Sequence, residues 1–330
     1  MAKEYLALKI RPPWIVIDEV QKVPKILDVV HRLIEENQVK FALTGSSARK
    51  LKRAQANLLA GRAFNFSLSS FSYIELGSSF ELERSLGFGS LPKLFGVELQ
   101  SEVDKKRYLK SYVSTYIREE IIVEQLVRNI EPFHRFLEVA AQVNGEIINY
   151  SKIGREASVA DKSVARYFEI LSDTLMGYLL PAYHKSVRKQ QIESPKFYFF
   201  DTGVVRAIRG DLKYTVNPHS YDFGKLFESF IIMEIVKQNK YFETDFKLYY
   251  LKTKDGVEVD LIVEDNRKTF LIEIKSKKIE NRKEVTALCS LSSSFKKSVS
   301  IVLCMNEKSV QIDENVLAMN WQDGIKFILS

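Results

Sequence analysis

Two carboxylates and a lysine in the last third of this 330-residue chain could act together on a phosphate ester. Alternation along a strand places Glu273 and Lys275 on one face, and a hairpin with the preceding strand would bring Asp260 beside them. Two such carboxylates can share Mg²⁺, while the lysine positions a water molecule and neutralises developing charge. This set suits phosphodiester hydrolysis, with Asp260 and Glu273 as expected metal ligands. Glu228, earlier in the chain, can supply a further carboxylate.

A second acidic pair, Asp18 and Glu19, follows the apolar run 14–17. Such a run, rich in β-branched residues, is typical of a strand that is buried on both faces. A helical pattern and a second strand pattern, 40–44, come next, and this order predicts a parallel sheet. Ligands bind beyond the carboxyl ends of the strands in such sheets, where Asp18, Glu19 and Thr44 would emerge together. The chemistry that needs this arrangement is nucleoside triphosphate hydrolysis, in which one carboxylate holds Mg²⁺ and the next polarises the attacking water.

The elements that would position Asp260 and Glu273 follow from the periodicity of the last third. We expect a long amphipathic helix from Phe223 to about Gln238, with Glu228 on it. Four strands are predicted at 247–251, 257–263, 269–275 and 298–304, and a helix around 282–291. The alternative is that the charges are solvated strand residues, because Asp followed by Glu-x-Lys also occurs by chance.

The middle of the chain has the pattern of a helix-turn-helix motif followed by a basic wing. Helices are predicted at 133–143, 150–157 and 162–175, the last capped by Asp161, with extended pieces at 178–180 and 196–200. A helical connector, 101–130, precedes them. If this part binds DNA, the groove-facing residues are Lys162, Ser163 and Arg166, and the phosphate contacts are Lys185, Arg188 and Lys189. Winged helices also serve as protein-interaction modules, which is the alternative.

The first third resembles a family of bacterial and archaeal AAA-type ATPases. The similarity, in order and spacing, lies in VIDEVQKVP, FALTGSSARKL and LLAGRAFNFSLSSFSYIEL. It implies that Asp18 and Glu19 are the Walker B pair, with Asp18 on the metal. It further implies that Thr44 is the sensor residue, that Arg62 is the arginine finger, and that ATP and Mg²⁺ are the cofactors.

The last third is similar to the restriction-endonuclease-like, or PD-(D/E)XK, superfamily, which includes Holliday-junction resolvases. The similarity lies in the order of Glu228, Asp260 and the Glu273-x-Lys275 pair. The ATPase family carries such a domain at its C terminus, so the resemblance covers nearly the whole chain.

One part of the ATPase pattern is missing. The phosphate-binding loop, Gly-x-x-x-x-Gly-Lys-Ser/Thr or Walker A, is expected some tens of residues before Asp18, where the chain has no glycine. Without backbone N–H groups around the phosphates and a lysine on them, triphosphate affinity is expected to be severely reduced. We therefore expect no ATP hydrolysis by this chain alone. A natural variant, a truncated gene and a misplaced start codon stay open as explanations.

The composition is that of a globular protein with a basic excess. There are 49 Lys and Arg against 42 Asp and Glu, a formal net charge of +7, which permits a DNA partner. No apolar run approaches the roughly 20 residues of a membrane span, and the first residues lack the pattern of a signal peptide. Cys289 and Cys304 are too few for a disulfide framework. We expect a cytoplasmic location and no membrane partner.

Together these features predict an α/β protein in three parts. They are a truncated AAA core with a partial P-loop-type parallel sheet over 1–100, a connector and winged-helix-like segment over 101–205, and a PD-(D/E)XK nuclease-like domain over 206–330. Three functions stay open. The chain is a DNA-binding ATPase-family protein with a nuclease-like domain, an active Mg²⁺-dependent endonuclease acting on DNA, or a non-catalytic module that docks on a protein partner. A homo-oligomer is also open.

Overall fold

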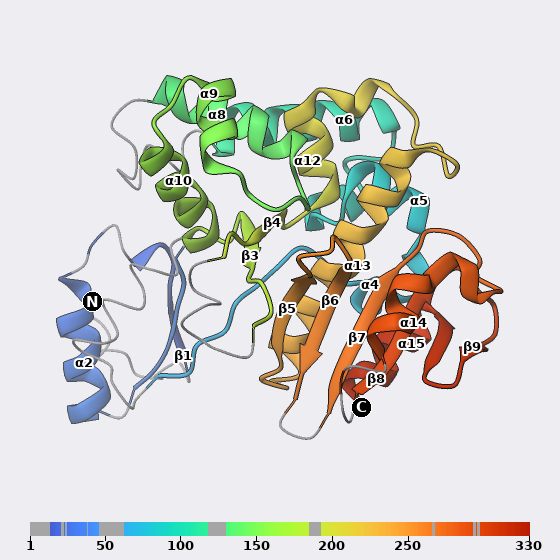
Figure 1. Ribbon diagram of the computed structural model, residues 1–330. Coiled ribbons are helices and arrows are strands. Elements are labelled where there is room, and N and C mark those ends of the chain that lie inside the picture. The colour runs from blue at the N-terminus through green and yellow to red at the C-terminus, as the bar shows by residue number, and fades with distance from the viewer. Residues whose placement is uncertain are drawn as a thin grey trace. The chain divides into compact units, whose positions relative to one another are not determined.

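A computed structural model describes residues 14–20, 23, 25–37, 39–45, 63–117, 130–184, 193–265, 268–292, 295 and 298–330. The described chain mixes helices and strands (Figure 1). It divides into two compact units, Met1–Leu68 with Asp173–Leu175 and Ser69–Ser172 with Met176–Ser330. The fold is therefore mixed α/β, as the sequence predicts.

The first unit contains a two-stranded parallel sheet. Strand β1 (Trp14–Ile17) pairs in register with β2 (Lys40–Leu43), and helix α2 (Ile26–Asn37) connects them. Parallel neighbours are usually joined through a helix, because the chain must return to the end of the sheet where the first strand began. A tight turn would make the two strands antiparallel. The predicted strand–helix–strand order and the parallel pairing are confirmed.

The prediction that the first strand is buried on both faces is wrong for the described residues. Trp14 is 53% exposed and Val16 is 68% exposed. Ile15 and Ile17 alternate with them and pack against buried residues, including Leu33. One face of β1 is thus covered and the other is open, which is the alternation of a half-buried strand.

The middle of the second unit is mainly helical. Its elements are α4 (Tyr73–Leu76), α5 (Leu82–Phe88), α6 (Glu102–Ser111), a π-helical turn (Tyr112–Ile117), α8 (Ile130–Gln142), α9 (Tyr150–Ala157), α10 (Asp161–Asp173), β3 (Gly177–Leu180), β4 (Lys196–Phe199) and α12 (Thr202–Arg209), with short 3₁₀ turns at Gly77–Ser79, Pro92–Phe95 and Asp211–Lys213. Strands β3 and β4 form an antiparallel pair. The predicted succession of three helices and two extended pieces is confirmed, although the third helix ends at Asp173 and not at 175.

An aromatic core holds these helices together. Phe133, Phe136 and Phe168 are buried with Phe197 and Phe199 of β4. Their rings meet edge-on or tilted, the arrangement that aromatic quadrupoles favour. Helix α10 therefore presents one apolar face to β4 and leaves its opposite face to solvent.

The last part of the second unit is a six-stranded mixed sheet. Its elements are α13 (Tyr221–Tyr241), β5 (Lys247–Lys252), β6 (Glu258–Glu264), β7 (Thr269–Ile274), a 3₁₀ turn (Arg282–Val285), α14 (Thr286–Ser292), β8 (Ser298–Cys304), β9 (Val310–Asp313), β10 (Val316–Asn320) and α15 (Trp321–Leu329). The strand order is β5-β6-β7-β8-β10-β9, with β7, β8 and β10 parallel and the other pairs antiparallel. The four predicted strands are confirmed, and β9, β10 and α15 were not predicted.

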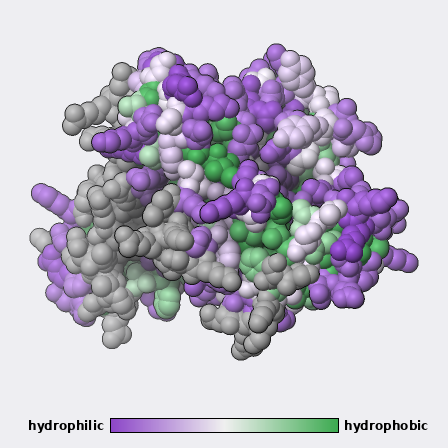
Figure 2. Space-filling view, in the orientation of Figure 1, coloured by the Kyte–Doolittle hydropathy of each residue, from purple (hydrophilic) through white to green (hydrophobic). Residues whose placement is uncertain are grey.

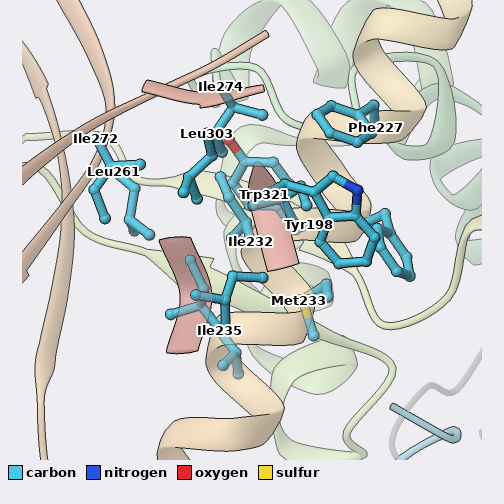
Figure 3. Close-up of a cluster of buried hydrophobic side chains, with 14 of the residues drawn as sticks. Tyr198, Phe227, Ile232, Met233, Ile235, Leu261, Ile272, Ile274, Leu303 and Trp321 are labelled. Carbon is cyan, nitrogen blue, oxygen red and sulfur yellow. The ribbon is translucent and has the colours of Figure 1, made fainter. Parts of the chain in front are cut away.

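Helices cover both faces of this sheet. Residues of α13 and α15, among them Ile232, Ile235 and Trp321, form one core with Ile272 and Leu303 (Figure 3). Leu288 and Cys289 of α14 belong to a separate core with other sheet residues. In the described part of the chain, no helix is long and apolar enough to span a membrane.

Candidate functional site

The predicted hairpin brings Asp260 to the Glu-x-Lys pair. Strands β6 and β7 are antiparallel, and the backbone N–H of Ile274 donates to Asp260 Oδ2 at 2.7 Å. Lys275 Nζ lies 2.7 Å from Glu273 Oε1. Glu273 and Lys275 thus share a side of the strand, while Ile274 between them turns into the hydrophobic core (Figure 3). The local geometry that alternation predicts for these residues is present.

Glu228 comes to the same place from helix α13. Phe227 and Ile231, on either side of it in sequence, are buried in the core against the sheet, which fixes the helix there. The hydroxyl of Tyr198 donates to Glu228 Oε1 at 2.7 Å. Burial and the negative charges of Glu228 and Glu273 raise the pKa of the Asp260 carboxyl well above its usual range. The three carboxylates therefore act on one another electrostatically.

The cluster contains two lysines, Lys275 and Lys196, and the same two effects act on the pKa of each. Burial by itself would lower the pKa of Lys275, but the carboxylates around it, Glu273 first, raise it above its ordinary value. Lys196 behaves in the same way, with Glu228 and Asp260 as the charges that raise its pKa against burial. Both side chains therefore stay cationic at neutral pH. Lys275 belongs to the predicted set, whereas Lys196 does not.

Lys196 and Tyr198 were missed by the sequence analysis. They lie on β4, and Lys196 Nζ is 2.6 Å from Glu258 Oε1 and 3.7 Å from Glu228 Oε1. A hydrogen bond of 2.6 Å from the Tyr250 hydroxyl to Ser194 O ties this strand to β5. The signal available in the sequence was a lysine directly before three aromatic residues of a strand, where burial of its charge demands a partner.

The side chains at the cluster suit a cation that needs few protein ligands. Glu273 Oε2 is buried without a hydrogen-bond partner, so one carboxylate oxygen is left for a ligand. Within the described residues, no group of three or more His, Cys, Asp or Glu side chains has the geometry of a metal site. Mg²⁺ is commonly held by only one or two carboxylates together with water and substrate phosphate. Asp260 and Glu273 fit that requirement, whereas a closed site with many protein ligands does not fit.

The second predicted set also meets at one edge of a sheet. The hydroxyl of Thr44 donates to Asp18 Oδ1, and the backbone N–H of Glu19 donates to Thr44 Oγ1 at 3.3 Å. Glu19 has a positive φ of 53°, a backbone conformation that non-glycine residues rarely adopt. The carboxyl ends of β1 and β2 thus bring Asp18, Glu19 and Thr44 together. Arg62 lies outside the described residues.

The predicted DNA-contacting residues are only partly described. On α10, Lys162 and Arg166 are exposed, and Ser163 is half-buried. Lys185, Arg188 and Lys189 lie outside the described residues. Hydrophilic side chains cover much of the second unit on the face in view, with smaller apolar areas between them (Figure 2). The described surface of α10 therefore presents two basic side chains, Lys162 and Arg166, to solvent.

Comparison with known proteins divides the chain into three matched segments. A family model described as an AAA domain matches residues 1–77. Two models described as domains of unknown function, DUF8612 and DUF4143, match residues 79–214 and 223–323. These matches support an AAA-like, ATPase-related protein.

Three bacterial proteins are similar over most of the chain. Uncharacterized proteins of Mycobacterium tuberculosis and Mycobacterium bovis are each 26% identical over 277 residues, which is 83% of this chain and 61% of the relative. A Haemophilus influenzae protein is 18% identical over 324 residues, covering 93% of this chain and 77% of the relative. The chain thus spans about three fifths of the length of its mycobacterial relatives.

Proposed function

We propose that the second unit is a Mg²⁺-dependent nuclease of the restriction-endonuclease-like type, carried by an AAA-like, ATPase-related protein. The observation that supports this most is the convergence of Asp260, Glu273, Lys275 and Glu228 from three elements that the fold rigidly packs together. A buried ion pair elsewhere on α13, Glu234 with Lys237, has one carboxylate and one lysine. At the cluster, two lysines and several carboxylates gather at a largely buried site, where electrostatic interactions are strong.

Each side chain has a role that its surroundings allow. Asp260 and Glu273 would hold the cation, Asp260 fixed by the Ile274 amide and Glu273 through its unbonded oxygen. Bound Mg²⁺ would supply Lewis-acid stabilisation of the phosphate's developing charge and favour ionisation of a bound water. Lys275, held by Glu273, can orient the attacking water and neutralise charge on the phosphate. Glu228 adds a further carboxylate to the site.

The substrate that we propose is DNA. Helices α9 and α10 and the β3–β4 pair have the order of a winged helix, and the strand β4 that ends this segment also carries Lys196 to the carboxylate cluster. The same segment would then bind the DNA and supply Lys196 to the cluster. Its base-facing residues would be Lys162, Ser163 and Arg166 of α10, and its phosphate contacts would be Lys185, Arg188 and Lys189.

Cleavage of linear, single-stranded and four-way-junction DNA tests the proposed activity. The protein is incubated with Mg²⁺ or Mn²⁺, and with EDTA as the metal-free control. Metal-dependent cutting by the wild type supports the nuclease. Absence of cutting on every substrate by folded protein, with DNA binding intact, would leave the last domain as a binding module.

For the first unit, we propose that these 330 residues by themselves hydrolyse no ATP, although the sheet edge has the residues of a nucleotide site. Asp18, Glu19 and Thr44 have the placement of a Walker B pair and a sensor, but the sequence contains no Gly-x-x-x-x-Gly-Lys-Ser/Thr stretch to bind the phosphates. Phosphate release from ATP by the chain should equal that of a Glu19→Gln variant. A wild-type rate that Glu19→Gln abolishes would contradict the proposal.

A further inference from the structure

Lys196 has a position that the proposed mechanism does not explain. Its side chain is 4% exposed, and its ammonium group lies between Glu258 and Glu228, at 2.6 Å and 3.7 Å. Removing an ammonium group from water is unfavourable unless carboxylates surround it. The fold nevertheless brings this charge in from another segment of the chain. Lys196 belongs to the segment matched by one family model, and the carboxylates belong to the next.

The strand that carries Lys196 holds it firmly. Its neighbours Phe197, Tyr198 and Phe199 are each no more than 1% exposed. The backbone of β4 pairs with β3, and the N–H of Gly145 donates to Phe197 O at 2.8 Å. The ammonium group is therefore placed by folding, and it does not exchange with solvent as a bound ion does.

The cluster holds more carboxylates than ammonium groups. Four carboxylates, those of Glu228, Glu258, Asp260 and Glu273, face the buried ammonium group of Lys196 and the half-buried one of Lys275. When all four carboxylates are ionised, as a bound cation requires of its ligands, four negative charges less two positive charges leave two negative charges, which equals the charge of one divalent cation. Lys252 also reaches Glu258, at 3.4 Å, but its side chain is 48% exposed, so that water screens its charge.

We propose that Lys196 is a built-in cation that occupies the place of a second metal ion, so that the cluster accepts one divalent cation, at Asp260 and Glu273. This inference deepens the proposed function and rests on it for the identity of the metal. Two-metal nucleases bring one ion to the attacking oxygen and one to the leaving oxygen. In this chain, a lysine from the middle segment takes one of those positions. The number of divalent cations that the cluster binds then depends on the middle segment, which supplies Lys196.

The number of Mn²⁺ ions bound per chain tests this directly. Free Mn²⁺ is measured by electron paramagnetic resonance during a titration of the full-length protein without DNA. The variants are Asp260→Asn, Lys196→Ala, Lys196→Arg and Lys252→Ala. Lys252→Ala is the matched control because it removes one positive charge from the same Glu258 but leaves the enclosed cluster intact.

We expect one Mn²⁺ per wild-type chain, and loss of that ion in Asp260→Asn. Lys196→Ala should bind two ions, because it opens both the space and the charge for a second cation, whereas Lys252→Ala should still bind one. Lys196→Arg should bind one, since it restores a cation of similar reach. Thermal unfolding of each variant shows whether it is folded.

A wild-type count of two, both lost in Asp260→Asn, would overturn the inference, and so would a wild-type count of none. These two results need no Lys196 variant and hold even if Lys196→Ala does not fold. A folded Lys196→Ala chain that binds one ion as tightly as the wild type would also overturn it. A count of one in a protein that cuts no DNA would remove the nuclease proposal but keep the built-in cation.

Discussion

The hydroxyl of Tyr198 on β4 donates a hydrogen bond to Glu228 Oε1 on α13 at 2.7 Å. Tyr198 is fully buried, and burial together with the Glu228 charge raises the pKa of its hydroxyl well above the usual value, so the hydroxyl remains a donor. This bond joins strand β4 of the middle segment to helix α13, which packs on the six-stranded sheet. It fixes the direction of the Glu228 side chain, which is 15% exposed.

Tyr198→Phe should loosen Glu228 without opening a cavity. Loss of a hydrogen bond to a charged, nearly buried acceptor is expected to lower the free energy of unfolding by about 1–3 kcal/mol. Cleavage should fall because Glu228 is no longer held. Urea unfolding and DNA cleavage measure the two effects. Tyr214→Phe, at a residue that is 61% exposed, is the control. Equal stability of the Tyr198 and Tyr214 variants would contradict this role.

Asp260→Asn should separate function from stability. The neutral side chain still accepts from the Ile274 amide through its carbonyl, but it no longer repels Glu228 and Glu273. In EDTA at neutral pH, the variant is therefore expected to be more stable than the wild type, since a raised folded-state pKa means that the ionised carboxylate costs stability there. Cleavage should drop to background, because a cation ligand is lost. Asp255→Asn, at an exposed turn residue, should change neither. A loss of stability in Asp260→Asn would contradict the claim that Glu228 and Glu273 repel the Asp260 carboxylate.

Gly89→Ala should disrupt the packing of the middle segment. Gly89 has a φ of 77°, and an added Cβ would overlap the carboxylate of Asp201, which caps α12 and accepts from the Ser90 amide at 2.7 Å. We expect a loss of about 2–4 kcal/mol in unfolding free energy. Gly210→Ala has a similar φ of 75° but open space around it, so it should lose only about 1 kcal/mol. Equal losses would show that Asp201 imposes no constraint.

Substitution of Lys185, Arg188 and Lys189 by alanine should weaken DNA binding in a salt-dependent way. If all three contact phosphates, the log–log slope of affinity against salt should flatten by about 0.9 per contact. Fluorescence anisotropy at several salt concentrations measures this slope. Lys326→Ala, an exposed lysine on α15, is the charge-matched control for one substitution. An unchanged slope in the triple variant would favour a protein partner for this segment.

The residues that the sequence could predict are those whose placement depends on local geometry. Asp260 and Glu273 meet because a hairpin and the two-residue period of a strand bring them together. Thr44 meets Asp18 for a similar reason, since the ends of parallel neighbours share an edge. Each of these contacts follows from one or two adjacent elements.

Lys196 and Tyr198 could not be predicted in this way. They reach Glu228 only because β4, at the end of one segment, packs against α13 of the next through Tyr198, Phe227 and neighbouring core residues. No period or spacing in the sequence encodes that packing. The open face of β1 was missed for a related reason, because an apolar run by itself does not reveal whether one face of its sheet is covered or both.

Lys275 is the residue whose replacement tests the central claim most directly. Single-turnover cleavage of the preferred DNA substrate is measured for the wild type, Lys275→Ala and Lys277→Ala in saturating Mg²⁺. Lys277 is an exposed lysine two residues away that pairs with Glu284, so it controls for charge and position. We predict that Lys275→Ala lowers the rate by about 100-fold or more while DNA binding is unchanged, and that Lys277→Ala keeps the wild-type rate. Equal rates for all three proteins, each folded and bound to DNA, would contradict a nuclease site at Asp260, Glu273 and Lys275.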